Sequence, residues 1–438
     1  MDWNWNRIPA EYLVTNVKLA RGGKLSKRKG FLHIQKGRVQ ALGVGEPSRE
    51  GVPVLDGGGL VCAPGLVDVH VHFREPGQEE KETIATGVRA AAAGGFTSVV
   101  TMPNTVPPID SAPMVRYLLD RADEAALCRV FPTAAISKGL GGETLTEFGD
   151  LVRAGAVGFT DDGKPVMHGK LMQFALQYAK QLGVPVTCHA EDCTLSGSGV
   201  MHAGYWSTKL GLSGIPRLAE DSMIFRDVEL AKATGGHLHV AHVSTKGAVE
   251  IIRRGKEDGV NVTGEVTPHH LSLDHSSCRD FSPHFKMNPP LREEEDIEAV
   301  TQGLIDGVLD CVATDHAPHT GMEKELMFDQ APFGVVGLET ALAVCHTYLV
   351  LEGKMDLGVL VGRMTEQAAA CYGLPVGTLE EGAEADFMLF DPDERWVVDP
   401  AKLAGRSRNT PYAGKELTGR VKATFLKGRL TWHDAAED

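Results

Sequence analysis

The sequence predicts an α/β fold: a TIM-type (β/α)8 barrel with a small β-sandwich domain built from both chain termini. In the central part of the chain, short runs rich in β-branched and aromatic residues alternate with longer runs of helical periodicity, as in parallel βα units. Eight such strand-like runs can be distinguished, which is the number that closes a barrel. Both ends of the chain carry hairpin patterns instead, around Lys36-Gly37 and Lys427-Gly428.

The predicted barrel strands are short apolar runs that end in polar residues. An open doubly wound sheet is the alternative, but it would need a glycine-rich phosphate turn after its first strand, where this chain has His-x-His. In chain order the strands are Leu66–His70, Phe96–Thr101, Arg129–Thr133, Val157–Thr160, Val184–His189, Leu238–His242, Val260–Val266 and Asp310–Thr314.

The predicted helices lie between these strands. Several begin at Ser, Thr or acidic residues and end near Gly, as helix termini do. They are Ser111–Ala126, Glu143–Ala154, Gly169–Leu182, Arg217–Thr234, Thr245–Asp258 and Glu293–Ile305.

The chain termini resemble each other rather than the middle. Residues 31–42 and 421–432 each read as a hairpin, and Ala385–Asp391 adds a strand that we expect to end at Pro392. Isolated hairpins are marginally stable and need further strands to pack against. We therefore expect a discontinuous β domain of residues 1–63 and 372–438, and a barrel of residues 64–371.

Composition narrows the class of protein. The 438 residues carry a net charge of −14, which argues against a nucleic acid partner. The eight cysteines form no Cys-x-x-Cys pair, and several lie in apolar runs, as reduced thiols of a cytosolic protein do. The first residues lack the pattern of a secretory signal, and no apolar run is long enough to cross a membrane. We expect a soluble, cytoplasmic enzyme or enzyme-like protein.

Candidate metal ligands recur at the ends of the predicted strands. His70 and His72 are two residues apart on the first strand, so their side chains share a face and form half of a divalent-metal site. The carboxyl ends of all strands meet at one mouth of a barrel. Imidazole and carboxylate ligands without thiolate suit zinc, and there are more of them than one tetrahedral ion needs, so we expect two zinc ions. The other strand ends supply Asp161, Asp162, His189, His242 and Asp315.

Several longer motifs resemble the amidohydrolase superfamily and, within it, the dihydroorotase family. Dihydroorotases interconvert N-carbamoyl-L-aspartate and (S)-dihydroorotate in pyrimidine (UMP) biosynthesis with zinc, and the resemblance implies the same here. It runs from Pro64 to about Leu379. The motifs that carry it are Asp68-Val-His-Val-His-Phe-Arg-Glu-Pro-Gly77, Lys81-Glu-Thr83, Ala93-Gly-Gly-Phe-Thr97, Met102-Pro-Asn-Thr105, Lys286-Met-Asn-Pro-Pro290 and Ala313-Thr-Asp-His-Ala-Pro-His319.

The resemblance also implies roles for single residues. It places His70 and His72 on the more buried metal ion and His189 and His242 on the second. Asp315 would ligate the first ion and act as general base and acid. Where many relatives bridge the ions with a carboxylated lysine, this chain has Asp161-Asp162, as in the bacterial class I subgroup. We choose Asp162 as the residue that bridges the two ions. We expect Asp161 either to support the metal ligands without touching the ions or to act as a cap.

Substrate recognition is expected to centre on Arg74, which continues the alternation of His70 and His72. A guanidinium can hold a substrate carboxylate through two hydrogen bonds. The resemblance adds Asn104, Asn288 and His319 as substrate contacts, together with the backbone of Phe333 and Gly334. We expect His269 and His270 to support the site rather than to ligate. Histidines outside any motif are assigned structural or surface roles: His33, His168, His202, His275, His284, His346 and His433.

Three alternatives remain. A sister cyclic amidase, such as a hydantoinase, dihydropyrimidinase or allantoinase, is disfavoured by Arg74-Glu75-Pro76-Gly77 and by the aspartates at strand four. An inactive homologue that only scaffolds aspartate transcarbamoylase should have lost metal ligands, whereas this chain keeps all of the expected ones. A nucleotide-binding domain would need a phosphate-binding loop, and the sequence contains no such motif. The resemblance leaves open a homodimer and an association with aspartate transcarbamoylase.

Overall fold

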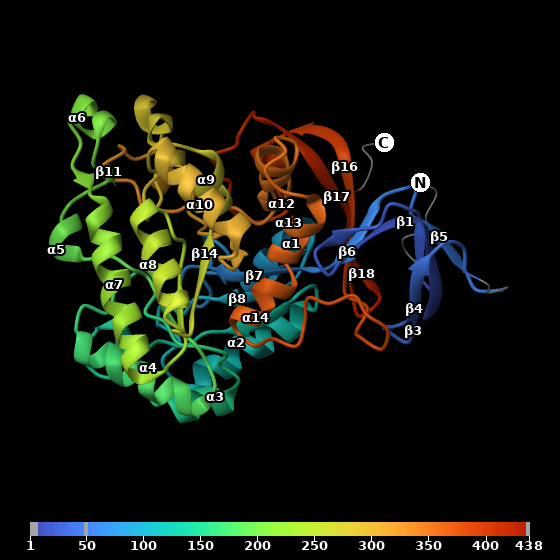
Figure 1. The fold of residues 1–438 in the computed structure, drawn as a ribbon, viewed down its shortest axis with the longest axis horizontal. Coiled ribbons are helices and arrows are strands. Elements are labelled where there is room, and N and C mark those ends of the chain that lie inside the picture. The colour runs from blue at the N-terminus through green and yellow to red at the C-terminus, as the bar shows by residue number, and fades with distance from the viewer. Residues whose placement is uncertain (1–7, 48–50, 435–438) are drawn as a thin grey trace.

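The computed structural model describes residues 8–47 and 51–434. Residues 1–7, 48–50 and 435–438, which we assigned to the terminal β domain, lie outside the described residues. Figure 1 shows helices surrounding the strands of the central segment, while the strands of both chain ends gather on one side of the molecule.

The central strands form a closed parallel barrel, which confirms the predicted fold class. The strand pairs follow chain order, and a bridge between Val71 and His316 joins the last strand position to the first. The barrel strands are β7 (Leu66–Val71), β8 (Phe96–Thr101), β9 (Arg129–Pro132), β10 (Val186–Cys188), β13 (Leu238–Val240), β14 (Val262–Val266) and β15 (Cys311–Val312).

The fourth and eighth strand positions are shorter than predicted. Around Phe159 the chain pairs only through single bridges, to Ala134 and to Val186, so Val157–Thr160 is no regular strand. The last strand ends at Val312, and Asp315 has a φ of +48°. A positive φ is incompatible with a β-strand, so the regular ladder is interrupted at this residue, and His316 beyond it pairs through single bridges to Val71 and Val335.

Helices pack around the barrel. The predictions of Gly169–Leu182 and Arg217–Thr234 match α4 and α7. The prediction of Glu143–Ala154 was too long, because Leu145 pairs with Ser137 and the helix begins at Phe148. The main barrel helices are α1 (Ile84–Ala93), α2 (Ala112–Ala125), α3 (Phe148–Ala154), α4 (Gly169–Leu182), α7 (Arg217–Thr234), α8 (Lys246–Glu257), α10 (Glu294–Asp306), α12 (Ala341–Cys345), α13 (Leu357–Arg363) and α14 (Glu366–Cys371).

The two chain ends share one sheet, with strand order β18-β17-β16-β6-β1-β3-β4. Both predicted hairpins are present. The expectation that a strand ends at Pro392 was wrong: β16 continues to Val397, with a shift of register between Asp391 and Arg395 that accommodates the proline. The strands are β1 (Glu11–Arg21), β2 (Lys24–Leu25), β3 (Gly30–Gln35), β4 (Arg38–Val44), β5 (Val54–Asp56), β6 (Val61–Pro64), β16 (Phe387–Val397), β17 (Glu416–Leu426) and β18 (Arg429–His433).

Short elements cover the mouth of the barrel at the carboxyl ends of its strands. They follow β10, β14 and β15, and a further segment between β16 and β17, residues 403–415, crosses over from the terminal sheet. We call this segment the crossing loop. The short elements are α5 (Cys193–Ser196), β11 (Met201–His202), α6 (Tyr205–Leu210), β12 (Gly214–Ile215), α9 (Pro268–Ser272), α11 (Gly321–Lys324), and the single turns His275–Asp280 and Pro283–Phe285.

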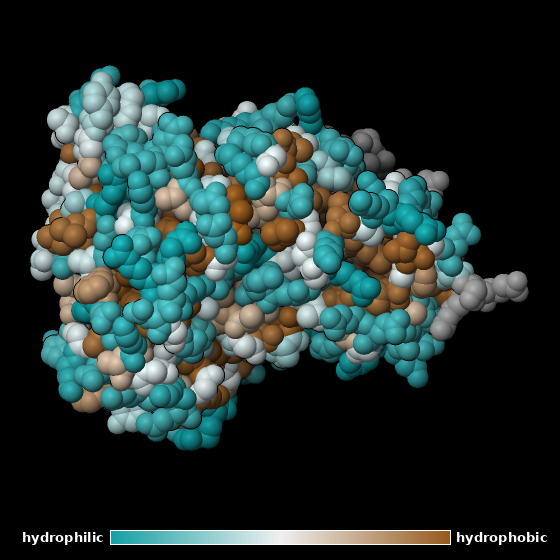
Figure 2. Space-filling model, viewed as in Figure 1, coloured by the Kyte–Doolittle hydropathy of each residue, from teal (hydrophilic) through white to brown (hydrophobic). Residues whose placement is uncertain are grey.

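The visible surface is largely hydrophilic. On the face seen in Figure 2, hydrophilic residues cover much of the helices, and hydrophobic residues gather in small groups. None of the described helices is long and apolar enough to cross a membrane. All eight cysteines are free thiols, and only Cys193 is exposed.

Candidate active site

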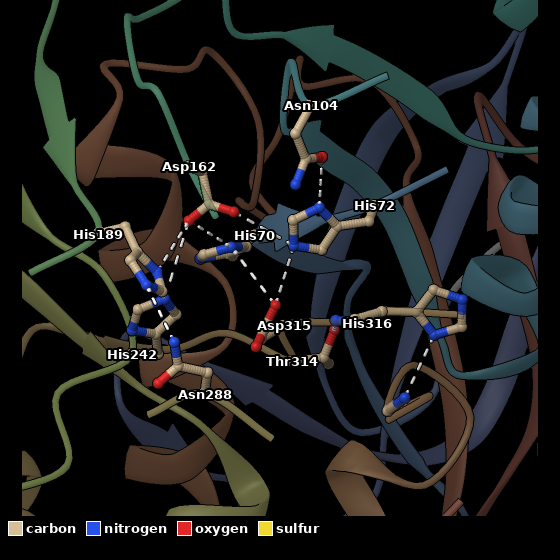
Figure 3. A network of polar contacts seen from close by, with 12 residues as sticks. His70, His72, Asn104, Asp162, His189, His242, Asn288, Thr314, Asp315 and His316 are labelled. Atoms are coloured by element: carbon tan, nitrogen blue, oxygen red, sulfur yellow. Dashed lines mark hydrogen bonds and ion pairs between the residues drawn. The ribbon is translucent and has the colours of Figure 1, made fainter. Parts of the chain in front are cut away.

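Five predicted metal ligands converge at the mouth of the barrel. Figure 3 shows Asp162 between two pairs of imidazoles, with Asp315 beside His70 and His72. Two groups of side chains lie close enough to hold an ion, and Asp162 belongs to both. The groups are His70, His72 and Asp162, and Asp162, His189 and His242; all five residues are buried.

Glu265 orients His70. Its Oε1 lies 2.6 Å from Nδ1 of His70, and its Oε2 lies 3.0 Å from Nε2 of His239. A carboxylate accepts the proton of Nδ1, so the other nitrogen of His70 faces the cluster. All three side chains are fully buried. The charged residue within the buried strand β14 was the sequence signal for this role, and our sequence reasoning missed it.

His72 is held in the same way by an amide. Its Nδ1 lies 2.8 Å from Oδ1 of Asn104, and its Nε2 lies 3.0 Å from Oδ1 of Asp315. The oxygen of Asn104 thus accepts the proton of Nδ1 and leaves Nε2 directed at the carboxylates. Asn104, predicted as a substrate contact, therefore also positions His72.

The second imidazole pair comes from the ends of β10 and β13. Nδ1 of His189 and Nε2 of His242 face each other at 2.9 Å. They lie 3.7 and 3.8 Å from Oδ1 of Asp162. Both nitrogens are thus near the oxygen that also faces His70.

The electrostatics of the cluster call for a positive ion. Nε2 of His70 and Oδ1 of Asp162 are buried without a hydrogen-bond partner and lie 3.4 Å apart. Burial alone would lower the pKa of His70, but the carboxylates of Asp162 and Glu265 raise it well above its ordinary value. Burial would likewise raise the pKa of Asp162, yet His70 holds it well below the ordinary range. Both shifts show that the carboxylates favour a positive charge here, and a divalent metal ion bound by imidazoles and carboxylates supplies one, so the donor set fits a metal-binding site.

Neighbouring aspartates have different surroundings. The carboxylate of Asp161 points to another part of the chain, where it accepts hydrogen bonds from the backbone N–H and the hydroxyl of Ser137. Asp162 faces the imidazoles instead. The chain turns here, with the N–H of Lys164 donating to the carbonyl of Asp161 at 2.9 Å, and of the two carboxylates only that of Asp162 joins the cluster.

Backbone strain accumulates around this cluster. Among the described residues, nine that are not glycine have a positive φ, and Arg74, His242 and Asp315 are three of them. Such conformations cost free energy and persist where the surroundings impose them, commonly at functional sites. Arg74 does not continue the strand alternation, as we had expected, because β7 ends at Val71 and its own φ is +62°.

Arg74 is a buried cation beside the cluster. It is 9% exposed, and no carboxylate among the described residues lies within ion-pair distance of it. Its Nε donates to the carbonyl of Pro318 at 3.2 Å, and one terminal nitrogen lies 3.5 Å from Nε2 of His319. Burial lowers its pKa. A buried guanidinium without an ion pair has charged donors available to an anion.

The other predicted substrate contacts surround the same space. Nδ2 of Asn288 lies 2.7 Å from Oε2 of Glu191, which in turn lies 3.4 Å from Nε2 of His189. Burial and the nearby Arg74 lower the pKa of His319 to about 3, so this imidazole is neutral.

The backbone of Phe333 and Gly334 is engaged within the protein. The carbonyl of Phe333 accepts from Nε2 of His319 at 2.7 Å. The N–H of Gly334 donates to the carbonyl of Lys286 at 2.9 Å, and its carbonyl accepts from Nδ2 of Asn409 at 3.1 Å. Any contact of a substrate with these carbonyls must use their second lone pair.

The remaining histidines near the mouth differ in their hydrogen bonds. Nδ1 of His270 lies 2.8 Å from the hydroxyl of Thr267 and its Nε2 lies 3.0 Å from the carbonyl of Pro289. His269 is buried, and its Nε2 has no hydrogen-bond partner. Both lie outside the two ion-holding groups.

A third group, His202, His275 and Glu293, is also compact enough for an ion. Arg292, however, lies 3.1 Å from Nδ1 of His202. Arginine is only a donor, so this nitrogen must accept and the proton of the neutral ring lies on Nε2, the atom 3.8 Å from Glu293. A protonated Nε2 offers no lone pair to a metal, and this group is structural.

Comparisons with known proteins identify relatives of this chain. The family described as dihydro-orotase-like matches residues 59–248. A dihydroorotase of Anaeromyxobacter dehalogenans (strain 2CP-C) is 51% identical over 97% of this chain and 100% of its own length. A dihydroorotase of Pelobacter propionicus is 48% identical over 95% of this chain and 99% of its own length.

Solved structures support the fold. An L-hydantoinase (dihydropyrimidinase) from Arthrobacter aurescens superposes with a TM-score of 0.87 at 25% identity, over 96% of both chains. A dihydropyrimidinase from Brevibacillus agri gives 0.84 at 23% identity, over 96% of this chain and 94% of its own.

Proposed function

Because the chain belongs to the dihydroorotase family, we propose that it catalyses the reversible cyclisation of N-carbamoyl-L-aspartate to (S)-dihydroorotate, with zinc, in de novo pyrimidine biosynthesis. The substrate assignment rests chiefly on Arg74, a buried cation without an ion pair beside the metal cluster. Both compounds carry a carboxylate, which neutral hydantoins and dihydropyrimidines lack. In a chain with a net charge of −14, an anionic substrate needs such a local cation.

We assign two zinc ions to the cluster. His70, His72 and Asp315 would hold one ion, His189 and His242 the other, and Asp162 would contact both. The two compact groups that share Asp162 support this assignment. When bound, zinc activates water and polarises the amide carbonyl.

Asp315 is the proposed general base and acid. Burial alone would raise its pKa, but His72 and the other nearby imidazoles hold it below the ordinary range, so it is a carboxylate at neutral pH. In hydrolysis, the oxygen of water bonds to the ring carbonyl carbon and the bond from that carbon to the ring nitrogen breaks. Asp315 takes a proton from the water and delivers it to the leaving nitrogen. Cyclisation is the reverse.

Arg74 would bind the substrate carboxylate, with Asn288 and His319 at the sides of the same space. Nδ1 of His319 is buried without a hydrogen-bond partner, which supports a role in binding. Asn104 would contact the substrate with its amide nitrogen while its oxygen holds His72. Phe333 and Gly334 would contribute the free lone pairs of their carbonyls.

The purified protein tests this proposal. We expect zinc by metal analysis and hydrolysis of dihydroorotate, followed by its absorbance, with much lower activity on hydantoin and dihydrouracil. A chelator should abolish turnover and zinc should restore it. Full activity without metal would contradict the zinc assignment, and a preference for a neutral cyclic amide would contradict the substrate assignment.

The remaining expectations stay predictions: a cytoplasmic location, a homodimer, an association with aspartate transcarbamoylase, and division of the chain near residues 63 and 372. The change of sheet between β6 and β7 supports the first boundary. The crossing loop does not follow the division at residue 372. It belongs by sequence to the terminal β domain, but it leaves the terminal sheet and contacts the barrel mouth.

A further inference from the structure

We propose that Asn409, in the crossing loop, is a positioning residue that holds two substrate-binding segments of the barrel in register. This inference rests on the proposed function, because it concerns the segments assigned to substrate binding. Asn409 lies outside the barrel sequence, and no motif in our sequence analysis included it.

The side chain of Asn409 joins the segment of His319 to the segment of Gly334. Its Nδ2 donates to the carbonyl of Ala317 at 3.0 Å and to that of Gly334 at 3.1 Å. Its Oδ1 accepts from the backbone N–H of His319 at 3.1 Å. Both amide hydrogens and one oxygen lone pair are therefore used, and each bond ends on a backbone group of a proposed binding segment.

The main chain of Asn409 adds a fourth connection, because its carbonyl accepts from the N–H of Val336 at 3.0 Å. Asn409 is 2% exposed, so water does not compete for these bonds. Removing the side chain would leave two carbonyls and one N–H buried without partners. The two segments would then be joined only by their direct bonds, from the N–H of Ala317 to the carbonyl of Val335 at 2.8 Å and from Nε2 of His319 to the carbonyl of Phe333 at 2.7 Å.

The crossing loop itself is firmly held over the mouth. The N–H groups of Ala404 and Gly405 donate to Glu339 at 2.8 and 3.0 Å. Farther along, the hydroxyls of Tyr412 and Ser272 lie 2.8 Å apart. Anchored on both sides of Asn409, the loop presents a fixed amide to the barrel. The terminal β domain thereby contributes to the substrate pocket.

The contacts around Gly334 explain why the relative position of these two segments tolerates little change. A Cβ at this position would lie 2.7 Å from Cβ of Ala317 and 3.1 Å from Nε2 of His319. The two segments therefore approach as closely as a glycine allows. Asn409 bridges them at this point of closest approach, so a small shift there moves His319 and the carbonyl of Phe333 together.

The test compares Asn409→Ala and Asn409→Asp in the full-length, zinc-loaded protein. Asn409→Asp keeps the size and the acceptor for His319 but loses the donors to Ala317 and Gly334. Ser407→Ala is the matched control, because Ser407 is buried in the same loop but donates to the carbonyl of Lys81, away from these segments.

Two measurements separate positioning from folding. Hydrogen exchange of the peptides covering residues 317–336 should become faster in both Asn409 variants and stay unchanged in Ser407→Ala. In steady-state kinetics, KM for dihydroorotate should rise by up to about 100-fold, since a misplacement of about 1 Å can cost that much. A merely unstable variant would lower kcat at unchanged KM, because fewer molecules are folded.

Unchanged exchange in the Asn409 variants would overturn the inference, as would an equal rise of KM in Ser407→Ala. Failure of both Asn409 variants to fold would assign this residue to stability and likewise overturn it. Failure of the proposed function would look different: the wild-type protein would not hydrolyse dihydroorotate, whatever the exchange rates of the variants.

Discussion

Nδ1 of His70 lies 2.6 Å from Oε1 of Glu265, a contact between residues 195 positions apart in the chain. It determines which nitrogen of His70 carries the proton and which faces Asp162. A histidine that donates to a carboxylate is a more basic and better oriented metal ligand. The cluster thus depends on a residue that is not itself proposed as a ligand.

We predict that Glu265→Gln lowers zinc affinity about 10- to 100-fold, the usual effect of removing the hydrogen-bond partner of a metal ligand. Glutamine has one acceptor oxygen, whereas Glu265 serves both His70 and His239. Competition with a chelating dye measures the affinity. Glu250→Gln, an exposed charge change on α8, is the control and should bind zinc as the wild type does. Equal affinity in both variants would refute the role of Glu265.

The two neighbouring aspartates form a matched pair. Asp162→Ala should lower the number of zinc ions bound per chain and abolish most activity, because Asp162 belongs to both ion-holding groups. Asp161→Ala removes only the hydrogen bonds to Ser137, so it should reduce thermal stability and retain zinc. Metal analysis after gel filtration distinguishes them. Loss of zinc from the Asp161 variant alone would reverse the assignment.

Arg74→Met should sharply lower kcat/KM for dihydroorotate and leave the zinc content intact. Truncating one partner of a buried charge pair costs about 2–5 kcal/mol, which is roughly 30- to 4,000-fold at ~1.4 kcal/mol per decade. Activity on neutral dihydrouracil should change far less, because that compound has no carboxylate. Arg254→Met, on the exposed face of α8, controls for net charge. Normal dihydroorotate hydrolysis by Arg74→Met would show that another group binds the carboxylate.

The buried carboxyl group of Glu339 makes stability depend on pH. Burial raises its pKa to about 7 from an ordinary value of 4.5. The folded protein therefore binds this proton more tightly than the unfolded chain, so stability falls as pH rises from about 4.5 to about 7. The effect reaches about 3 kcal/mol at most.

Glu339→Gln removes this titration. The difference in Tm between wild type and variant should shift in favour of the wild type as pH falls from 8 to 5. A difference that is constant over this range would show that Glu339 has an ordinary pKa.

The sequence alone predicted the barrel and most of the candidate site. Periodicity placed the strands, and in a parallel barrel the ends of all strands lie at one mouth, so four histidines and the pair Asp161-Asp162 could be assigned to one place before any coordinates. The resemblance to the dihydroorotase family then favoured Asp162 over Asp161. Helices α4 and α7 also agree with their predicted bounds, because the glycines that end them, Gly183 and Gly235, are local signals.

Only the tertiary structure showed which side chains position the residues of that site. Glu265 reaches His70 across the barrel, Asn409 reaches His319 from a loop of the terminal domain, and Arg74 leaves the strand alternation through a positive φ. Local periodicity determines which face of an element a residue occupies, but it carries no information about the path of a connecting loop. Contacts between distant segments depend on that path, and therefore only the folded chain reveals them.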